Sequence, residues 1–228
     1  MFRKFLGGAV AVALFTMAGA AQAVVVNVDF EDLGPGLVLG APGLSSQGFT
    51  LAPATGRVAS ALNGGCIACA SNGTRSLVAG GIGIGPASGN PISMTSDGGF
   101  TFRLLSLDIA EFVNIDNDDN ADQILLTGFV TGGGTVGETL FLDNINDGDG
   151  GVADFQAGAL SGFWASSILT QLDISGLRTG DGAADRGFSL DNIVVDADGI
   201  EVPEPATLAL LGAGLFGLGW ARRWRKTA

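Results

Sequence analysis

The feature that most limits the fold is the composition of the region between the chain's two apolar ends. Short runs of β-branched, aliphatic and aromatic residues recur there, separated by clusters of Gly, Asn and Asp. The chain holds 38 glycines among 228 residues, and glycine readily adopts the positive φ that tight turns between strands require. No stretch of this region keeps a 3.6-residue apolar period with helix caps. The pattern therefore predicts an all-β fold.

Several segments have the length and composition of strands, and residues 100–107 begin with the polar–apolar alternation of a strand that buries one face. The predicted strands are residues 24–30, 49–51, 76–78, 100–107, 124–130, 139–142, 169–174 and 188–195. One short helix is predicted around residues 155–164. Many short strands within a single domain predict a β-sandwich, and we expect a jelly roll.

The N-terminal end has the three parts of a secretory signal peptide. Arg3 and Lys4 form a positive start, residues 5–18 are apolar, and Ala21-Gln22-Ala23 is a small-residue cleavage site. We therefore predict a signal peptide over residues 1–23 and a mature chain that begins at Val24.

The C-terminal end combines a turn, an apolar run and a basic cluster. Pro203, Glu204 and Pro205 precede residues 206–220, and Arg222 and Arg223 begin the basic end. An apolar run of this length spans about 22 Å as a helix, less than the roughly 30 Å of a bilayer core. The segment is therefore predicted to be a short transmembrane helix with its basic end on the cytoplasmic side.

This order of parts resembles the PEP-CTERM sorting tail of Gram-negative bacteria, which the membrane protease exosortase recognises and cleaves. The resemblance implies a sorting tail over residues 201–228, export across the inner membrane, and delivery to the cell surface or extracellular matrix. Contact with the membrane would then be limited to the tail before processing. An ordinary C-terminal anchor is the alternative. The remaining residues, 24–200, are predicted to form one β-sandwich domain.

Removing both ends changes the charge of the chain. Residues 24–202 carry 22 acidic and 5 basic residues, a net charge of −17, and they contain no lysine. Such a surface repels nucleic acid phosphates and anionic lipids, and it favours cations. Nucleic acid is therefore excluded as a partner.

The chain contains no histidine, which excludes Ser-His-Asp, Cys-His and most zinc-hydrolase sites. Carboxylate chemistry remains, because a glycosidase needs only two suitably placed acids. None of the four glutamates of the mature segment, however, lies in a recognisable catalytic context. We therefore predict a protein that is not an enzyme. A carboxylate-based glycan hydrolase or lyase is one alternative, and an ice-binding or adhesive surface protein is another.

Cys66 and Cys69 are the only cysteines. In an exported chain they predict a local disulfide that closes a small loop. A redox C-x-x-C motif is the weaker alternative, because glycines precede the pair where such a motif needs a strand and a following helix.

Two loops are rich in acids. Asp116 and Asp118 belong to a run with an oxygen-bearing side chain at every second position, a spacing that suits calcium in loop backbone. The second loop contains Asp143, Asp147, Asp149 and Asp154. Its spacing partly matches an EF-hand loop, but no helix pattern flanks it. Both clusters are candidate calcium ligands, and solvated acidic loops are the alternative.

A third set of residues is spread over the whole domain. The first strand ends in Asp29-Phe30-Glu31, a step into a later strand reads Asn72-Gly-Thr-Arg-Ser-Leu77, and the last strand contains Asp191-Asn192-Ile193. This set resembles galactose-binding-like jelly rolls, including carbohydrate-binding module families, in which these motifs share a structural calcium. The resemblance implies that Glu31 and Asp191 are ligands, with Asp29 and carbonyls near Thr74 completing the shell. In the alternative, Asp191 and Asn192 merely begin a turn or face solvent.

The sugar site of those modules is not evident here. They stack sugars on exposed Trp or Tyr rings, whereas residues 24–202 contain no Tyr and a single Trp, Trp164. Trp164 is therefore predicted to be a core or rim residue, and a role as the ligand platform is the alternative. The sequence predicts an exported protein that binds or scaffolds exopolysaccharide, with calcium as a structural cofactor and exosortase as its processing partner.

Overall fold

The structure, a computed structural model, describes residues 23–34, 38–40, 43–54, 58–61, 70, 73–79, 91–112, 120–143, 154–180 and 186–198. In these residues thirteen strands and two short helices follow one another along the chain. The strands are β1 Val24–Val28, β2 Val38–Gly40, β3 Leu44–Ser46, β4 Phe49–Pro53, β5 Val58–Ala61, β6 Ser76–Ala79, β7 Ile92–Ser96, β8 Thr101–Glu111, β9 Gln123–Val130, β10 Thr135–Phe141, β11 Gln156–Ala157, β12 Leu169–Leu177 and β13 Phe188–Asp198. The helices are the 3-10 turn η1 Glu31–Leu33 and α1 Gly162–Ser166.

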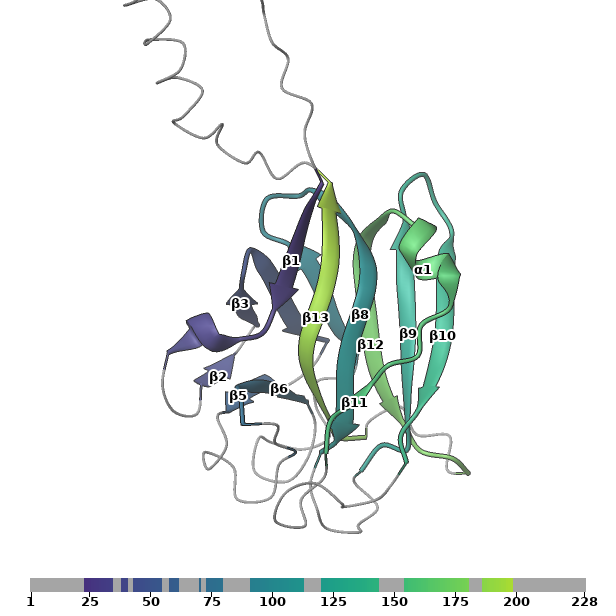
Figure 1. Ribbon diagram of the computed structural model, residues 1–228. Coiled ribbons are helices and arrows are strands. Elements are labelled where there is room, and N and C mark those ends of the chain that lie inside the picture. The colour runs from purple at the N-terminus through teal and green to yellow at the C-terminus, as the bar shows by residue number, and fades with distance from the viewer. Residues whose placement is uncertain are drawn as a thin grey trace, which may run out of the picture.

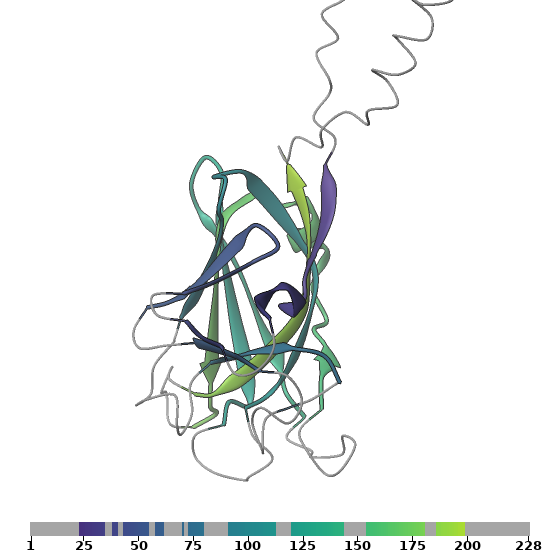
Figure 2. The same ribbon diagram turned by 90° about the vertical axis from the view of Figure 1, so that its left-hand side faces the viewer.

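The strands form one curled antiparallel sheet whose two halves face each other (Figures 1 and 2). One half has the order β2-β5-β6-β13-β8, with β1 also paired to β13 and β11 to β8. The other half has the order β3-β4-β7-β12-β9-β10. A single residue pair, Leu169 with Phe102, joins β12 to β8 and links the halves. The all-β prediction is confirmed, and the jelly-roll order remains a prediction.

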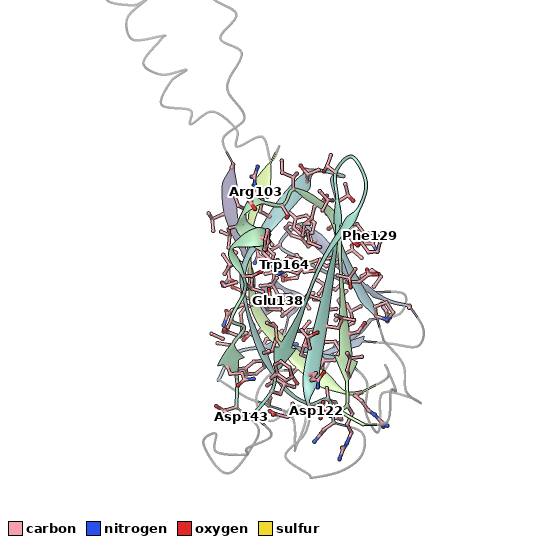
Figure 3. The ribbon with its side chains drawn as sticks, turned by 90° about the vertical axis from the view of Figure 1, so that its right-hand side faces the viewer. Arg103, Asp122, Phe129, Glu138, Asp143 and Trp164 are labelled. Carbon is pink, nitrogen blue, oxygen red and sulfur yellow. The ribbon has the colours of Figure 1, made fainter. Side chains whose placement is uncertain are left out.

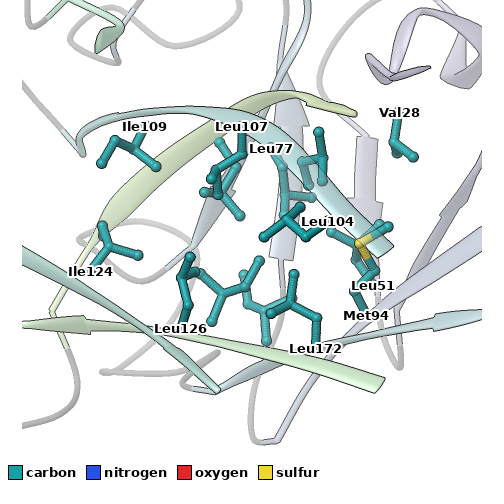
Figure 4. Close-up of a cluster of buried hydrophobic side chains, with 14 of the residues drawn as sticks. Val28, Leu51, Leu77, Met94, Leu104, Leu107, Ile109, Ile124, Leu126 and Leu172 are labelled. Atoms are coloured by element: carbon teal, nitrogen blue, oxygen red, sulfur yellow. The ribbon is translucent and has the colours of Figure 1, made fainter. Parts of the chain in front are cut away.

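The core fills the space between the two halves (Figure 4). The apolar residues of β9 and β12 alternate along each strand, so Ile124 and Leu126 face Leu104 and Leu107 of β8 across the core. Near one end, the ring of Phe49 meets those of Phe100 and Phe102 edge to face, with centroids 5.4 and 5.3 Å apart. This packing is what the period of two in the sequence predicts.

All eight predicted strands overlap observed ones, whereas β2, β3, β5, β7 and β11 were not predicted. The helix predicted over residues 155–164 is wrong for most of its length, since only Gly162–Ser166 is helical. The backbone of Gly158 lies against β8, where its N–H donates to the Leu107 carbonyl over 2.9 Å. A Cβ at this position would lie 2.9 Å from Leu140 Cδ1. The segment before the helix therefore packs closely against β10 as well as β8.

Several predictions fall on residues that the structure does not describe. These are the signal peptide up to residue 22, the transmembrane run 206–220, the sorting residues Pro203, Glu204, Pro205, Arg222 and Arg223, the Cys66–Cys69 disulfide, and Asp116, Asp118, Asp147 and Asp149. Within the described ranges, no helix has both the length and the apolar character needed to cross a membrane.

Candidate functional site

The three dispersed motifs meet on β13, at the point between its pairing with β6 and its pairing with β1. Along one edge of β13, β6 pairs with residues 188–190 and β1 pairs with residues 193–197. Asp191 and Asn192 lie between these pairings, where the register of β13 against β8 also shifts. The chain that leaves β1 and the chain that enters β6 therefore meet at Asp191, and we call this region the strand junction (residues 29–34, 73–76, 191 and 192).

Hydrogen bonds tie the strand junction together. Thr74 Oγ1 donates to Asp191 Oδ2 over 2.7 Å, and the Asn192 backbone N–H donates to Asp191 Oδ1 over 2.8 Å. The Arg75 backbone N–H donates to Glu31 Oε1 over 2.6 Å. Asp191 is fully buried, so these donors replace part of the hydration that its carboxylate loses. The alternative of a solvent-facing Asp191 is wrong.

Arg75 is a part of the junction that the sequence reasoning missed. Its side chain is 1% exposed, and its guanidinium donates to the Gly34 carbonyl. Its backbone and side chain thus hold η1 at two points, Glu31 and Gly34. Residues 24–202 contain only five basic residues, and Arg75 directly precedes the strand β6. This rarity and position are the signal that could have drawn attention to it.

Two non-glycine residues at the junction have left-handed backbone, Phe30 with φ 61° and Asn192 with φ 46°. Asparagine tolerates this conformation better than most residues. The amide of Asn192 also donates to Asp108 Oδ2 over 2.8 Å and accepts from the Asn27 amide over 3.3 Å. The left-handed bend of β13 at Asn192 is therefore held by side-chain hydrogen bonds to β1 on one side and to β8 on the other.

The carboxylates of Glu31 and Asp191 and the hydroxyl of Thr74 are oxygen ligands, which suits the predicted calcium. Glu31 and Asp191 come close through adjacent residues of the 73–76 segment, whereas Asp29 accepts the backbone N–H of Glu31 over 3.2 Å. No three His, Cys, Asp or Glu residues of the described ranges lie close enough together to hold a metal. Calcium at this site would depend on two carboxylates with hydroxyl and carbonyl oxygens, and it remains a prediction. Asp143 and Asp154 of the acidic loops are placed, one exposed and one half-buried, and their role as ligands is also still a prediction.

Trp164 is not a ligand platform. The side chain is 1% exposed, and its Nε1 donates to Glu138 Oε2 over 2.6 Å (Figure 3). The ring fits over Gly128, where a Cβ would lie 2.9 Å from Trp164 Cζ3. Because α1 holds the indole in this space, neither ring face is open for stacking, and the predicted core position is the observed one.

The outer face of the other sheet half carries a polar cluster beside an exposed ring. Ser93 of β7 lies opposite Asp173 of β12, and Asp173 lies opposite Thr127 of β9. Gln171 of β12 lies opposite Phe129 of β9, whose side chain is 37% exposed (Figure 3). These five residues, Ser93, Thr127, Phe129, Gln171 and Asp173, are called the outer-face cluster.

Internal hydrogen bonds orient the cluster. Asp173 Oδ1 accepts from Ser93 Oγ over 2.7 Å and from Gln171 Nε2 over 2.6 Å. The three strands contain no Lys or Arg, so the face presents hydroxyls, an amide and a carboxylate without a positive charge. Phe129 stands at an outward position of β9, where alternation calls for a polar residue, and that break in the pattern is the signal the sequence analysis passed over.

Comparisons with known proteins address the chain's end and its fold. Residues 201–225 match the family model described as the PEP-CTERM protein-sorting motif. The C-terminal segment is a PEP-CTERM sorting motif. The motif implies that exosortase processes the chain and that the protein is secreted, membrane-anchored or exposed at the cell surface.

No curated protein matches the chain. Among solved structures, a DUF4465 family protein from Bacteroides caccae is similar at 15% identity and a TM-score of 0.46, covering 77% of this chain and 100% of that one. At this distance the likeness supports no argument about function.

Proposed function

We propose that the protein is a non-enzymatic surface or matrix protein of a Gram-negative bacterium, and that its β-domain binds exopolysaccharide through the outer-face cluster. The observation that carries the proposal is the placement of Phe129 beside the Gln171–Asp173 pair. An aromatic ring binds the C–H face of a sugar, while neighbouring amide and carboxylate groups bind its hydroxyls.

The chemistry of the face favours a neutral polysaccharide. Asp173 repels anionic sugars, and the strands that form the face supply no Lys or Arg to neutralise uronate or sulfate groups. Gln171 and Ser93 are already held by Asp173, so little side-chain entropy is lost when a sugar replaces water. A long polymer adds further contacts along the sheet, because Asp97 similarly orients Ser45 and Thr50 on the neighbouring strands β3 and β4.

The test uses the exported chain, residues 24–228, purified in a mild detergent. Affinity electrophoresis through gels that contain a neutral glucan, a galactan, a mannan or an anionic polyuronate measures retardation by each polymer. We expect retardation by at least one neutral polymer, and Phe129→Ala should weaken it by roughly tenfold, as loss of an aromatic contact implies. Gln171→Ala should also weaken it, because the amide that would bind a sugar hydroxyl is lost.

Phe163→Ala is the matched control, because Phe163 is another exposed ring, 74% accessible, on α1. This variant should bind as the wild type does. Absence of retardation by every neutral polymer, or equal losses for the Phe129 and Phe163 variants, would refute the proposal.

We also propose that the strand junction binds a structural calcium ion through Glu31 and Asp191. The buried carboxylate of Asp191 and the oxygen-bearing side chains of Glu31 and Thr74 beside it support this assignment. An ion there would fasten β1, β6 and β13 to one another and so stabilise the fold.

A further inference from the structure

The strand β10 has an open edge of seven residues. Among the residues that the structure describes, it pairs only with β9, and the other edge strands there are shorter: β2 and β3 have three residues, β11 two and β1 five. Natural sheets usually protect a long edge with lysine, proline or a β-bulge. The sequence of β10, TVGETLF, contains neither residue, and its pairing with β9 shows no register shift.

The backbone groups that face this edge follow from the hairpin. Val130 N–H donates to the Gly134 carbonyl, and Leu142 N–H donates to the Asp122 carbonyl. Even-numbered residues of β10 therefore bond to β9, and the odd-numbered ones direct N–H and C=O outward. The Phe141 carbonyl fits this alternation, since it accepts the Gln156 amide from outside the hairpin over 2.7 Å. The outward groups of Thr135, Gly137 and Thr139 make up the open part of the edge.

We infer that this edge pairs with the same edge of a second copy of the chain, antiparallel and about a two-fold axis at Gly137. In this register Thr135 of one copy lies opposite Thr139 of the other, and each pair exchanges both backbone hydrogen bonds. The result is a sheet that continues from β9 and β10 of one copy into β10 and β9 of the next.

Two observations select this register and this occupant. A shift of the axis to Glu138 would place two carboxylates opposite each other and would use the Phe141 carbonyl that Gln156 already occupies. With the axis at Gly137, Glu138 stays bonded to Ser161 and Trp164 on the core side. Glu138 is the one charged residue of β10, and in this register it lies opposite Val136 of the other copy, so no two carboxylates are directly opposed.

Gly137 gives a direct test because it lies on the proposed axis. A Cβ there would meet only the Leu126 carbonyl, at 3.5 Å, so larger residues are tolerated by the monomer. Sedimentation equilibrium of residues 24–228 in mild detergent should show a reversible dimer. The variants Gly137→Lys and Gly137→Glu should each weaken it by roughly tenfold or more, because like charges then lie directly opposite. Mixing the two variants should restore the dimer.

Two further variants separate edge pairing from other contacts. Ser175→Lys adds the same charge on β12, inside the sheet, and should leave the dimer intact. Thr139→Pro removes an outward N–H and should abolish the dimer. In hydrogen exchange, the amides of Gly137 and Thr139 should slow as protein concentration rises, whereas those of Val136 and Leu140 stay slow throughout. A monomer at all concentrations, a dimer that survives Gly137→Lys, or no recovery on mixing would overturn the inference.

Discussion

The buried arginine of the strand junction provides the sharpest test of how the fold is held together. Arg75→Met keeps most of the side-chain volume and removes the guanidinium. The backbone bond from residue 75 to Glu31 is retained, so the loss is confined to the charged group. Because Arg75 is 1% exposed, no water can take over the bonds that it makes.

The expected cost can be estimated from these contacts. The charged hydrogen bond to the Gly34 carbonyl contributes about 1.5–3 kcal/mol. We therefore expect the free energy of unfolding to fall by about 1.5–3 kcal/mol, a substantial part of the total stability of a domain of this size.

Arg103→Met is the matched control for the same chemical change. Arg103 forms a partly exposed ion pair with Asp196, with a 3.3 Å separation and side chains 23% and 25% exposed. Such pairs contribute about 0–1 kcal/mol. Urea unfolding of both variants, followed by far-UV circular dichroism, measures the difference. If the two variants lose the same stability, or Arg75→Met loses less than about 1 kcal/mol, then the junction does not depend on its buried charge.

Three other changes test separate parts of the structure. Gly176→Ala should destabilise the fold by about 3 kcal/mol or more in urea unfolding, because the new Cβ would clash with the Arg186 carbonyl and lie 2.7 Å from Phe188 Cδ1. Gly137→Ala is the control, since its surroundings are open, and it should change stability by less than about 0.5 kcal/mol. Equal effects of the two variants would contradict the packing described. Trp164→Phe removes the bond to Glu138 and should cost about 1–3 kcal/mol, so an unchanged melting temperature would mean that this bond does not hold α1. If calcium binds the strand junction, chelation should lower the melting temperature of the wild type and not that of Asp191→Asn, with a loss of about 2.7 kcal/mol when the ion was present at 100 times its Kd; a wild type indifferent to chelator excludes the ion.

The sequence was sufficient to predict the strands with a clear period of two. Alternation in β8, β9 and β12 reflects burial of one face, a local property that survives in the fold. Of the missed strands, β2, β3 and β11 have only two or three residues, which is too short to show a period. The other two are β5, whose four residues VASA are mostly small, and β7, whose five residues ISMTS do alternate apolar with polar but form only a short run. Strand pairing depends on residues far apart in the sequence. It could be predicted only where a motif linked distant segments, as with Glu31, Thr74 and Asp191.

The outer-face cluster and the buried Trp164 show what local patterns leave out. Phe129 and Trp164 are both aromatic and both lie among small or polar neighbours in the sequence. Gly128 decides between them, because the space above this glycine accepts the indole of Trp164, while the next residue along β9 points outward. Which ring is buried therefore depends on how α1 lies over β9, and sequence spacing does not specify that contact.

The position of β13 connects the fold to the sorting motif. This last strand pairs with β8 along its length and with both β6 and β1 on its other edge, so that half of the sheet cannot close until residues 188–198 have been exported. Only residues 199–202 separate β13 from the Pro203-Glu204-Pro205 turn, and fully extended they span at most about 14 Å. Because Val24 pairs with Ala197, the start of β1 and the end of β13 lie side by side at the same end of the domain (Figure 1). The sorting motif of residues 201–225 therefore follows closely on the strand that completes this half of the sheet.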